Sequence, residues 1–185
     1  MMRKDGNLFT SVSEKHSLLI LTGLREMDRP VMITEITDLV HNQTLRMMVD
    51  DMEEDGLVDI EVVISDRKRV MVSLTDLGRD VALMLSMVNV AVAPGKDIVE
   101  KSVDMKYADP ILRILRARGP VIASNITKLI PSNITVSKLL TVMEEDGLVK
   151  KETPPGKVRP LRFILTPLGV QIADIYQSIY EKITK

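Results

Sequence analysis

The sequence contains no cysteine, and this absence excludes several kinds of chemistry. Without a thiol there is no disulfide framework, no thiolate nucleophile and no thiolate metal site. The chain has only two histidines, His16 and His41, and neither stands with carboxylates at a metal-ligand spacing. A Gly-rich phosphate loop, a nucleophile elbow and a paired acid–base constellation are also missing. The sequence therefore predicts that the protein is not an enzyme and needs no cofactor.

Long apolar segments are missing as well. Residues 1–10 lack the apolar core, roughly 7 to 15 residues long, that a signal peptide requires. The most apolar run, residues 81–93, is interrupted by Ser86 and Asn89 and is shorter than the ~20 residues needed to cross a bilayer. We therefore expect a cytoplasmic protein without membrane contact, in which residues 81–93 form a helix buried on nearly every face.

The charged residues are divided unequally along the chain. Residues 1–93 hold 10 Lys and Arg against 16 Asp and Glu, a net charge of -6. Residues 94–185 hold 15 against 10, a net charge of +5, and the whole chain carries -1. Because neutralisation of phosphates supplies most non-specific affinity for nucleic acid, the second half is the one expected to bind DNA.

A repeat divides the chain into two similar halves. Residues 52–58, Met-Glu-Glu-Asp-Gly-Leu-Val, recur unchanged as residues 143–149, an offset of 91. The same offset relates Leu-Thr-Asp-Leu-Gly at residues 74–78 to Leu-Thr-Pro-Leu-Gly at residues 165–169. Seven consecutive identities with a second motif in register are not a chance match. Each half is therefore expected to fold as a unit of its own.

Each unit is predicted to run helix, helix, turn, helix, hairpin, helix. The third helix has apolar residues at i, i+3, i+4 and i+7, which predicts one buried face. These residues are Leu45, Met48, Val49 and Met52 in the first unit and Val136, Leu139, Leu140 and Met143 in the second. Gly56 and Gly147 are placed to end these helices, and Thr75 and Thr166 to cap the helix that follows each hairpin.

The segment Pro-Ser-Asn-Ile-Thr-Val-Ser-Lys-Leu-Leu at residues 131–140, running into residues 143–149, resembles the recognition helix of prokaryotic winged-helix regulators of the MarR and ArsR types. The Leu-Thr-x-x-Gly motifs are similar to the signature that follows the wing in those families. The resemblance implies a mainly α fold with small β-hairpin wings (α+β). It comprises two winged helix-turn-helix domains in tandem, residues 1–93 and 109–185, with a linker over residues 94–108 and a hydrophobic connecting helix.

The resemblance also implies DNA-contacting residues, because such recognition helices lie in the major groove while the wing touches the backbone or minor groove. In the second unit these are Ser132, Asn133, Thr135, Ser137 and Lys138, with Lys157 and Arg159 on the wing. In the first unit they are Asn42, Gln43, Thr44 and Arg46, with Arg67, Lys68 and Arg69 on the wing. There, Asp50 and Asp51 replace Thr141 and Val142, and carboxylates repel phosphates. The second unit is therefore the expected DNA reader.

Several features admit a purely structural explanation. Small polar residues at the start of a helix can simply cap it, and a basic hairpin tip is a charged turn in any soluble protein. The Glu-Glu-Asp clusters at residues 53–55 and 144–146 could bind a hard cation, but their recurrence at one helix end favours a role in the fold. The helices at residues 75–93 and 166–185 fit either packing between the units, as an intramolecular pseudo-dimer, or a homodimer.

Two functions remain in competition. The first is a transcriptional regulator that binds double-stranded DNA. The alternative is a tandem winged-helix module for protein–protein interaction, similar to the ScpB-like proteins of chromosome partition or to transcription-initiation adaptors. The Thr-Val-Ser-Lys helix and the basic second half favour DNA, whereas the acidic first half favours a protein partner. Fold alone does not decide between them, because function belongs to the site.

Overall fold

The structure is a computed structural model, and it describes residues 9–40, 45–64, 67–130, 132–153 and 160–185. The first half contains η1 (Ser11–Ser13), α1 (Ser17–Met27), β1 (Val31–Met32), α2 (Ile33–Leu39), α3 (Leu45–Glu54), β2 (Val58–Ile64), β3 (Lys68–Leu74) and α4 (Asp76–Ala91). The second half contains η2 (Ile98–Glu100), η3 (Ser102–Asp104), α5 (Ala108–Arg118), β4 (Val121–Ile122), α6 (Ala123–Ile126), α7 (Asn133–Glu145), β5 (Val149–Glu152), β6 (Arg162–Leu165) and α8 (Pro167–Ile183). From α1 to α4 and again from α5 to α8, helices and strands follow in the same order. The predicted α+β class is confirmed.

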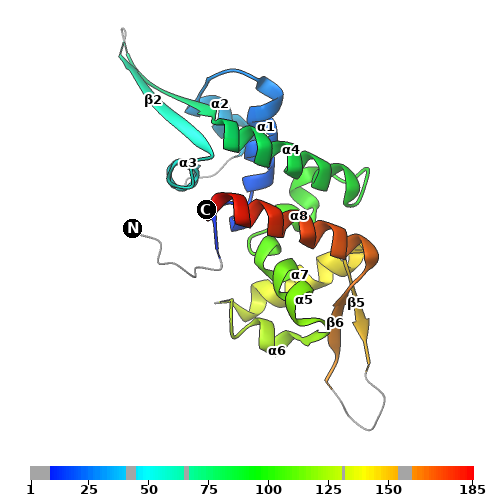
Figure 1. Ribbon diagram of the computed structural model, residues 1–185. Helices are drawn as coiled ribbons and strands as arrows, with labels where there is room; N and C mark the ends of the chain where they lie inside the picture. Colours follow the sequence, from blue (N-terminus) through cyan, green and yellow to red (C-terminus); the bar gives the residue numbers. More distant parts are fainter. Residues whose placement is uncertain (1–8, 41–44, 65–66, 131, 154–159) are drawn as a thin grey trace.

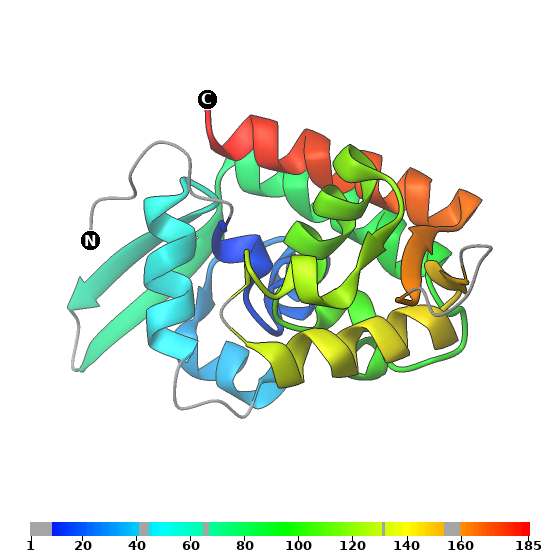
Figure 2. The same cartoon turned by 90° about the horizontal axis from the view of Figure 1, so that it is seen from below.

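The two sheets have the same topology. Each has three antiparallel strands, in the order β1-β3-β2 and β4-β6-β5. The registers also correspond, since Val58 faces Leu74 in the first sheet and Val149 faces Leu165 in the second. The two hairpins project at opposite ends of the molecule (Figures 1 and 2).

The two repeated motifs lock together within each half. The Thr166 hydroxyl accepts a hydrogen bond from the Gly169 amide at 3.0 Å and donates one to the Gly147 carbonyl at 2.6 Å. Gly169 packs so closely that a Cβ atom there would lie 1.9 Å from the carbonyl oxygen of Leu148. Thr75 makes the same bonds in the first half, at 2.9 Å and 2.7 Å. The predicted threonine caps are therefore confirmed, and the last glycine of each motif is required by a close approach of backbone.

The predicted core faces of α3 and α7 are also confirmed. All eight residues of the two apolar stripes are buried, with Met48 the most accessible at 6% exposure. Gly56 and Gly147 follow the helix ends with φ values of 70° and 73°, a conformation that glycine adopts without the steric penalty of a side chain.

Helices α4 and α8 lie side by side between the halves (Figures 1 and 2). Helix α4 also packs on α1, and α8 on α5. Val81, Leu85 and Val88 are buried, but Leu83 is 47% and Met87 58% exposed. The expectation that this helix is buried on nearly every face is wrong for the side that carries Leu83 and Met87. The reason is that α1 and α8 cover only part of its circumference.

Reciprocal backbone bonds join the halves just before α1 and α5. The His16 amide donates to the Asp104 carbonyl at 3.0 Å, and the Tyr107 amide donates to the Ser13 carbonyl at 2.8 Å. His16 and Tyr107 occupy equivalent positions in the repeat, as do Ser13 and Asp104. The two bonds are therefore related by an approximate two-fold symmetry. The segment predicted as a linker, residues 94–108, contributes to this junction through η3.

Buried polar side chains reinforce the junction. The Asp104 carboxylate accepts a hydrogen bond from the Leu19 amide at 3.2 Å and lies 2.9 Å from Nδ1 of His16. Asp109 accepts from the Ser13 hydroxyl at 2.8 Å and is ion-paired with Arg113. Burial raises the pKa of both carboxyl groups, and their hydrogen bonds partly oppose the shift. The described helices include none with the length and apolarity needed to span a membrane.

Candidate nucleic-acid interface

The start of α7 is fixed by a local hydrogen-bond pair. The Ser132 hydroxyl accepts from the Thr135 amide at 3.3 Å and donates to the Thr135 hydroxyl at 2.7 Å. Both residues are half-buried. The capping explanation of Ser132 is therefore correct, and the Ser132 hydroxyl proton is already donated to Thr135. Asn133 begins the helix, and its side chain lies outside what the structure describes.

The outward face of α7 carries Ser137 and Lys138. Both side chains are exposed, and they lie on the side opposite the buried stripe that ends at Met143. Thr141, one turn beyond Ser137, is also exposed and donates its hydroxyl to the Ser137 carbonyl at 3.1 Å. A lysine ammonium here extends from a rigid helix into solvent, as contact with a groove requires.

Ile134 was not among the predicted site residues. It lies in the first turn of α7 and is 86% exposed, the highest exposure of any large apolar side chain in the described chain. Its signal in the sequence is its position, because it falls two residues before Val136 and off the apolar stripe. Helix α7 therefore exposes an apolar side chain at its N-terminal end beside the polar ones.

The second hairpin contributes further basic side chains. Lys150 on β5 and Arg162 on β6 are exposed, and both lie on the face of the sheet opposite Phe163. Lys151 is ion-paired with Glu144 of α7 at 2.5 Å, so part of its charge is neutralised. The predicted wing residues Lys157 and Arg159 lie outside the described residues.

The equivalent face of the first half is chemically different. Arg46 is ion-paired with Asp50 at 2.9 Å, one turn along α3. Met47, which is 67% exposed, occupies the position of Lys138. The described part of α3 therefore presents a neutralised arginine and an apolar side chain where α7 presents a serine and a lysine. The candidates Asn42, Gln43 and Thr44 lie outside the described residues.

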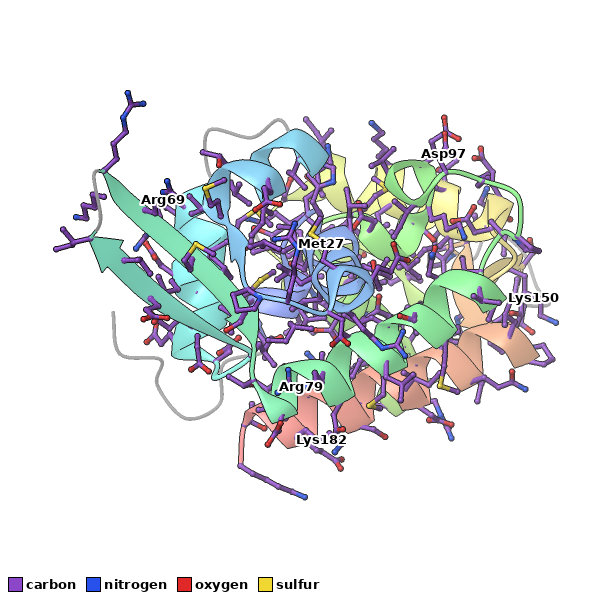
Figure 3. All side chains as sticks on the ribbon, turned by 90° about the horizontal axis from the view of Figure 1, so that it is seen from above. Met27, Arg69, Arg79, Asp97, Lys150 and Lys182 are labelled. Carbon is purple, nitrogen blue, oxygen red and sulfur yellow. The ribbon has the colours of Figure 1, made fainter. Side chains whose placement is uncertain are left out.

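The tip of the first hairpin is basic and remote from the core. Arg67, Lys68 and Arg69 are all exposed. Figure 3 shows Arg69 at the outer end of this hairpin, on the opposite side of the molecule from Lys150. The two sets of basic side chains therefore do not form one continuous patch.

The Glu-Glu-Asp clusters serve the fold at their aspartates. The Asp55 carboxylate accepts a hydrogen bond from the Ser11 amide at 2.7 Å, and Asp146 accepts one from the Ser102 amide at 2.7 Å. In the described chain, no group of three or more His, Cys, Asp or Glu residues is arranged to hold a metal ion.

A hollow of about 570 Å³ lies at the base of the first hairpin, away from α7. Its lining includes Arg25, Arg29 and Arg79 together with Asp28 and Asp59. Arg29 is ion-paired with Glu35, and Arg79 with Asp76. The hollow is therefore of mixed charge, with two of its three arginines already paired.

No family model matches the chain, and no curated protein matches its sequence.

Proposed function

We propose that the protein is a transcriptional regulator that binds double-stranded DNA through a winged helix-turn-helix unit in its second half. The observation that carries this proposal is the outward face of α7, where Ser137 and Lys138 are exposed on a rigid helix. Their equivalents in the first half, Arg46 and Met47, are an ion-paired side chain and an apolar one.

The order of elements supports the proposal. A short helix α6 precedes α7, and the hairpin β5–β6 follows it, which is the order of a helix-turn-helix with a wing. In this arrangement α7 enters the major groove. Lys138 donates to guanine acceptors, and Ile134 meets a thymine methyl group.

The surrounding charges supply affinity that does not depend on sequence. Lys128, Lys150 and Arg162 are exposed on the same half as α7. Cations of this kind displace counterions from phosphates, so binding weakens steeply with salt. The net charge of +5 over residues 94–185 agrees with this role.

The contacts between the halves support a fused pseudo-dimer. Helices α4 and α8 pack on each other, and the exchange of backbone bonds by His16 and Tyr107 follows the same approximate two-fold symmetry. In dimeric winged-helix regulators, two chains would supply these two halves. Here one chain carries both, and the halves have diverged at the residues that face DNA.

The competing function is protein–protein interaction by a tandem winged-helix module. The observation that favours it is the surface of α3, where an exposed Met47 stands beside the acidic residues Asp50 and Asp51. We assign this surface to a protein contact only if the second half fails to bind DNA.

Selection of genomic DNA fragments on the purified full-length protein tests the proposal. We expect enrichment of fragments that share a common sequence, with binding that weakens on going from low to high salt. Equal recovery of unrelated fragments, or no binding at low salt, would rule out the function as a regulator and favour the protein-interaction module.

A further inference from the structure

Strand β2 has an open edge. The strand order β1-β3-β2 places it at the border of its sheet, and in the described residues it pairs only with β3. The Ile60 amide points away from β3, since it donates to Oε1 of Glu53 at 3.3 Å. Peptide groups alternate in direction along an antiparallel strand. The amide and carbonyl groups of Val62 and Ile64 therefore also point away from β3.

The outer part of this strand is apolar and exposed. Val62, Val63 and Ile64 have exposures of 46%, 37% and 82%. Exposed edges normally carry lysine, proline or a short strand, which prevent pairing with another chain. The equivalent strand β5 follows that rule, because it is shorter and places Lys150, Lys151 and Glu152 at its exposed positions. Residues 62–64 contain no such protection.

The hairpin has opposite charges at its two ends. Its base carries Asp59 and Glu61 on β2, with Glu53 of α3 beside Ile60. Its tip carries Arg67, Lys68 and Arg69, all exposed. When two such hairpins run antiparallel, the basic tip of each lies beside the acidic base of the other.

We propose that two copies of this chain associate by antiparallel pairing of β2 with β2, around a two-fold axis that passes through Val62. Only residues with outward peptide groups can bond across this edge, and these are Ile60, Val62 and Ile64. The axis sets Val62 opposite Val62 of the second copy and Ile60 opposite Ile64. In this register the outward amides and carbonyls of Val62 and Ile64 and the Ile60 carbonyl are paired, and the Ile60 amide exchanges its bond with Glu53 for one to Ile64 of the second copy. The result is one continuous sheet in the order β1-β3-β2-β2-β3-β1.

The register also explains the charges. It places Glu61 opposite Val63 of the second copy, and within each hairpin Val63 faces Arg69. Glu61 of one copy and Arg69 of the other therefore lie on the same face, separated by one small side chain, within reach of a long arginine. Within its own hairpin Lys68 faces Ile64, which lies opposite Ile60 of the other copy. Lys68 is therefore aligned across the sheet with that Ile60, and Glu53 of the other copy lies beside it. Each contact occurs twice by symmetry.

Sedimentation velocity of the full-length protein over a concentration series tests the pairing. The variant Val62→Pro removes an outward amide and leaves the ladder to β3 intact, so the monomer is expected to fold. We expect a dimer for the parent and an increase of at least about tenfold in the dimer dissociation constant for V62P. The matched control is Thr153→Pro, at the equivalent position of the second hairpin, and it should leave the dimer unchanged. A monomeric parent at about 100 μM, or equal dissociation constants for the parent and V62P, would overturn the proposal.

Charge reversal tests the register. Glu61→Arg and Arg69→Glu should each weaken the dimer, since each creates a like-charge pair. The double variant should restore it, because the pair re-forms with opposite signs. Failure of the double variant to recover would refute the register.

Two further outcomes would refute the pairing itself. One is a dimer that is abolished by Met87→Lys on α4 but not by V62P. The other is an R69E variant that loses DNA affinity while its dimer is unchanged.

Discussion

The carboxylate of Asp146 accepts hydrogen bonds from both the amide and the hydroxyl of Ser102, each at 2.7 Å. Its other oxygen is ion-paired with Lys96 at 2.6 Å, and its side chain is fully buried. One residue of the repeated Glu-Glu-Asp-Gly motif thus holds the segment between α4 and α5 against the end of α7. The equivalent Asp55 binds the Ser11 amide in the first half.

Replacement of Asp146 by alanine should therefore destabilise the protein strongly. The buried Ser102 amide and hydroxyl lose their acceptor, and Lys96 loses its partner. We expect a loss of about 2 to 4 kcal/mol in the free energy of unfolding, measured by urea titration. The matched change Asp55→Ala should cost less, about 1 to 2 kcal/mol, because Asp55 is only half-buried. Equal and small losses would contradict the anchoring role of Asp146.

Gly169 should not tolerate a side chain. A Cβ atom at this position would lie 1.9 Å from the Leu148 carbonyl oxygen, so backbone must shift to admit it. We expect Gly169→Ala to cost about 2 kcal/mol or more, since overpacking against backbone cannot be relieved by a rotamer change. The control is Gln171→Ala on the exposed face of the same helix, which should change stability by less than about 0.5 kcal/mol. Thermal melting of both variants is the measurement, and a parental melting temperature for G169A would disprove the close contact.

Asp104 should make stability depend on pH with an unusual sign. Burial raises the pKa of its carboxyl group in the folded protein above that of the unfolded chain. Protonation of such a group favours folding. Its contribution to the stability of the protein is therefore complete below the pKa in the unfolded chain, about 3.9, and is lost as pH rises through the pKa in the folded protein. The parent should therefore gain stability relative to Asp104→Asn as pH falls from about 7 towards 4.

The control for this measurement is Glu35→Gln. The pKa of Glu35 is lowered by its hydrogen bond with Arg29, so the sign is opposite and the parent should lose stability relative to E35Q as pH falls. Urea titrations at several pH values give both differences. A D104N difference that is constant with pH, or that runs in the same direction as the E35Q difference, would contradict the assignment.

Lys157 and Arg159 are predicted to contact phosphates from the second wing. Changing both to alanine should weaken binding to all DNA sequences about equally, because phosphate contacts carry no sequence information. The slope of log affinity against log salt should fall by about 0.9 for each lost contact. Fluorescence anisotropy at several salt concentrations measures both quantities. An unchanged slope would show that this wing does not touch DNA.

The repeated parts of the fold were accessible from the sequence because they depend on local geometry. Apolar spacing predicts that Val136 and Met143 are buried, and the threonine of each Leu-Thr-x-x-Gly motif is predicted to cap the helix that follows. The bonds from Ser11 to Asp55 and from Ser102 to Asp146 were not predicted. They join a backbone amide to a side chain 44 residues away, and no periodicity marks such a pair.

The exposed surfaces are less predictable from the sequence than the core. The sequence showed that α4 is apolar around most of its circumference, but it did not show that α1 and α8 leave Leu83 and Met87 uncovered. That outcome depends on the packing of helices far apart in the chain. In the candidate interface, Lys138 was identified from a motif and is exposed, whereas Thr135 is half-buried and bonded to Ser132. Ile134, which is exposed in the first turn of α7, is not among the residues predicted from the sequence.

The substitution Lys138→Ala tests whether α7 reads DNA. The measurement is the affinity for a selected duplex and for a scrambled duplex, with the matched variant Met47→Ala as control. We expect K138A to lose about 1 to 3 kcal/mol of discrimination between the two duplexes, while M47A retains it and both variants keep the parental melting temperature. A K138A protein that discriminates as well as the parent would contradict the assignment of α7 as the reading helix.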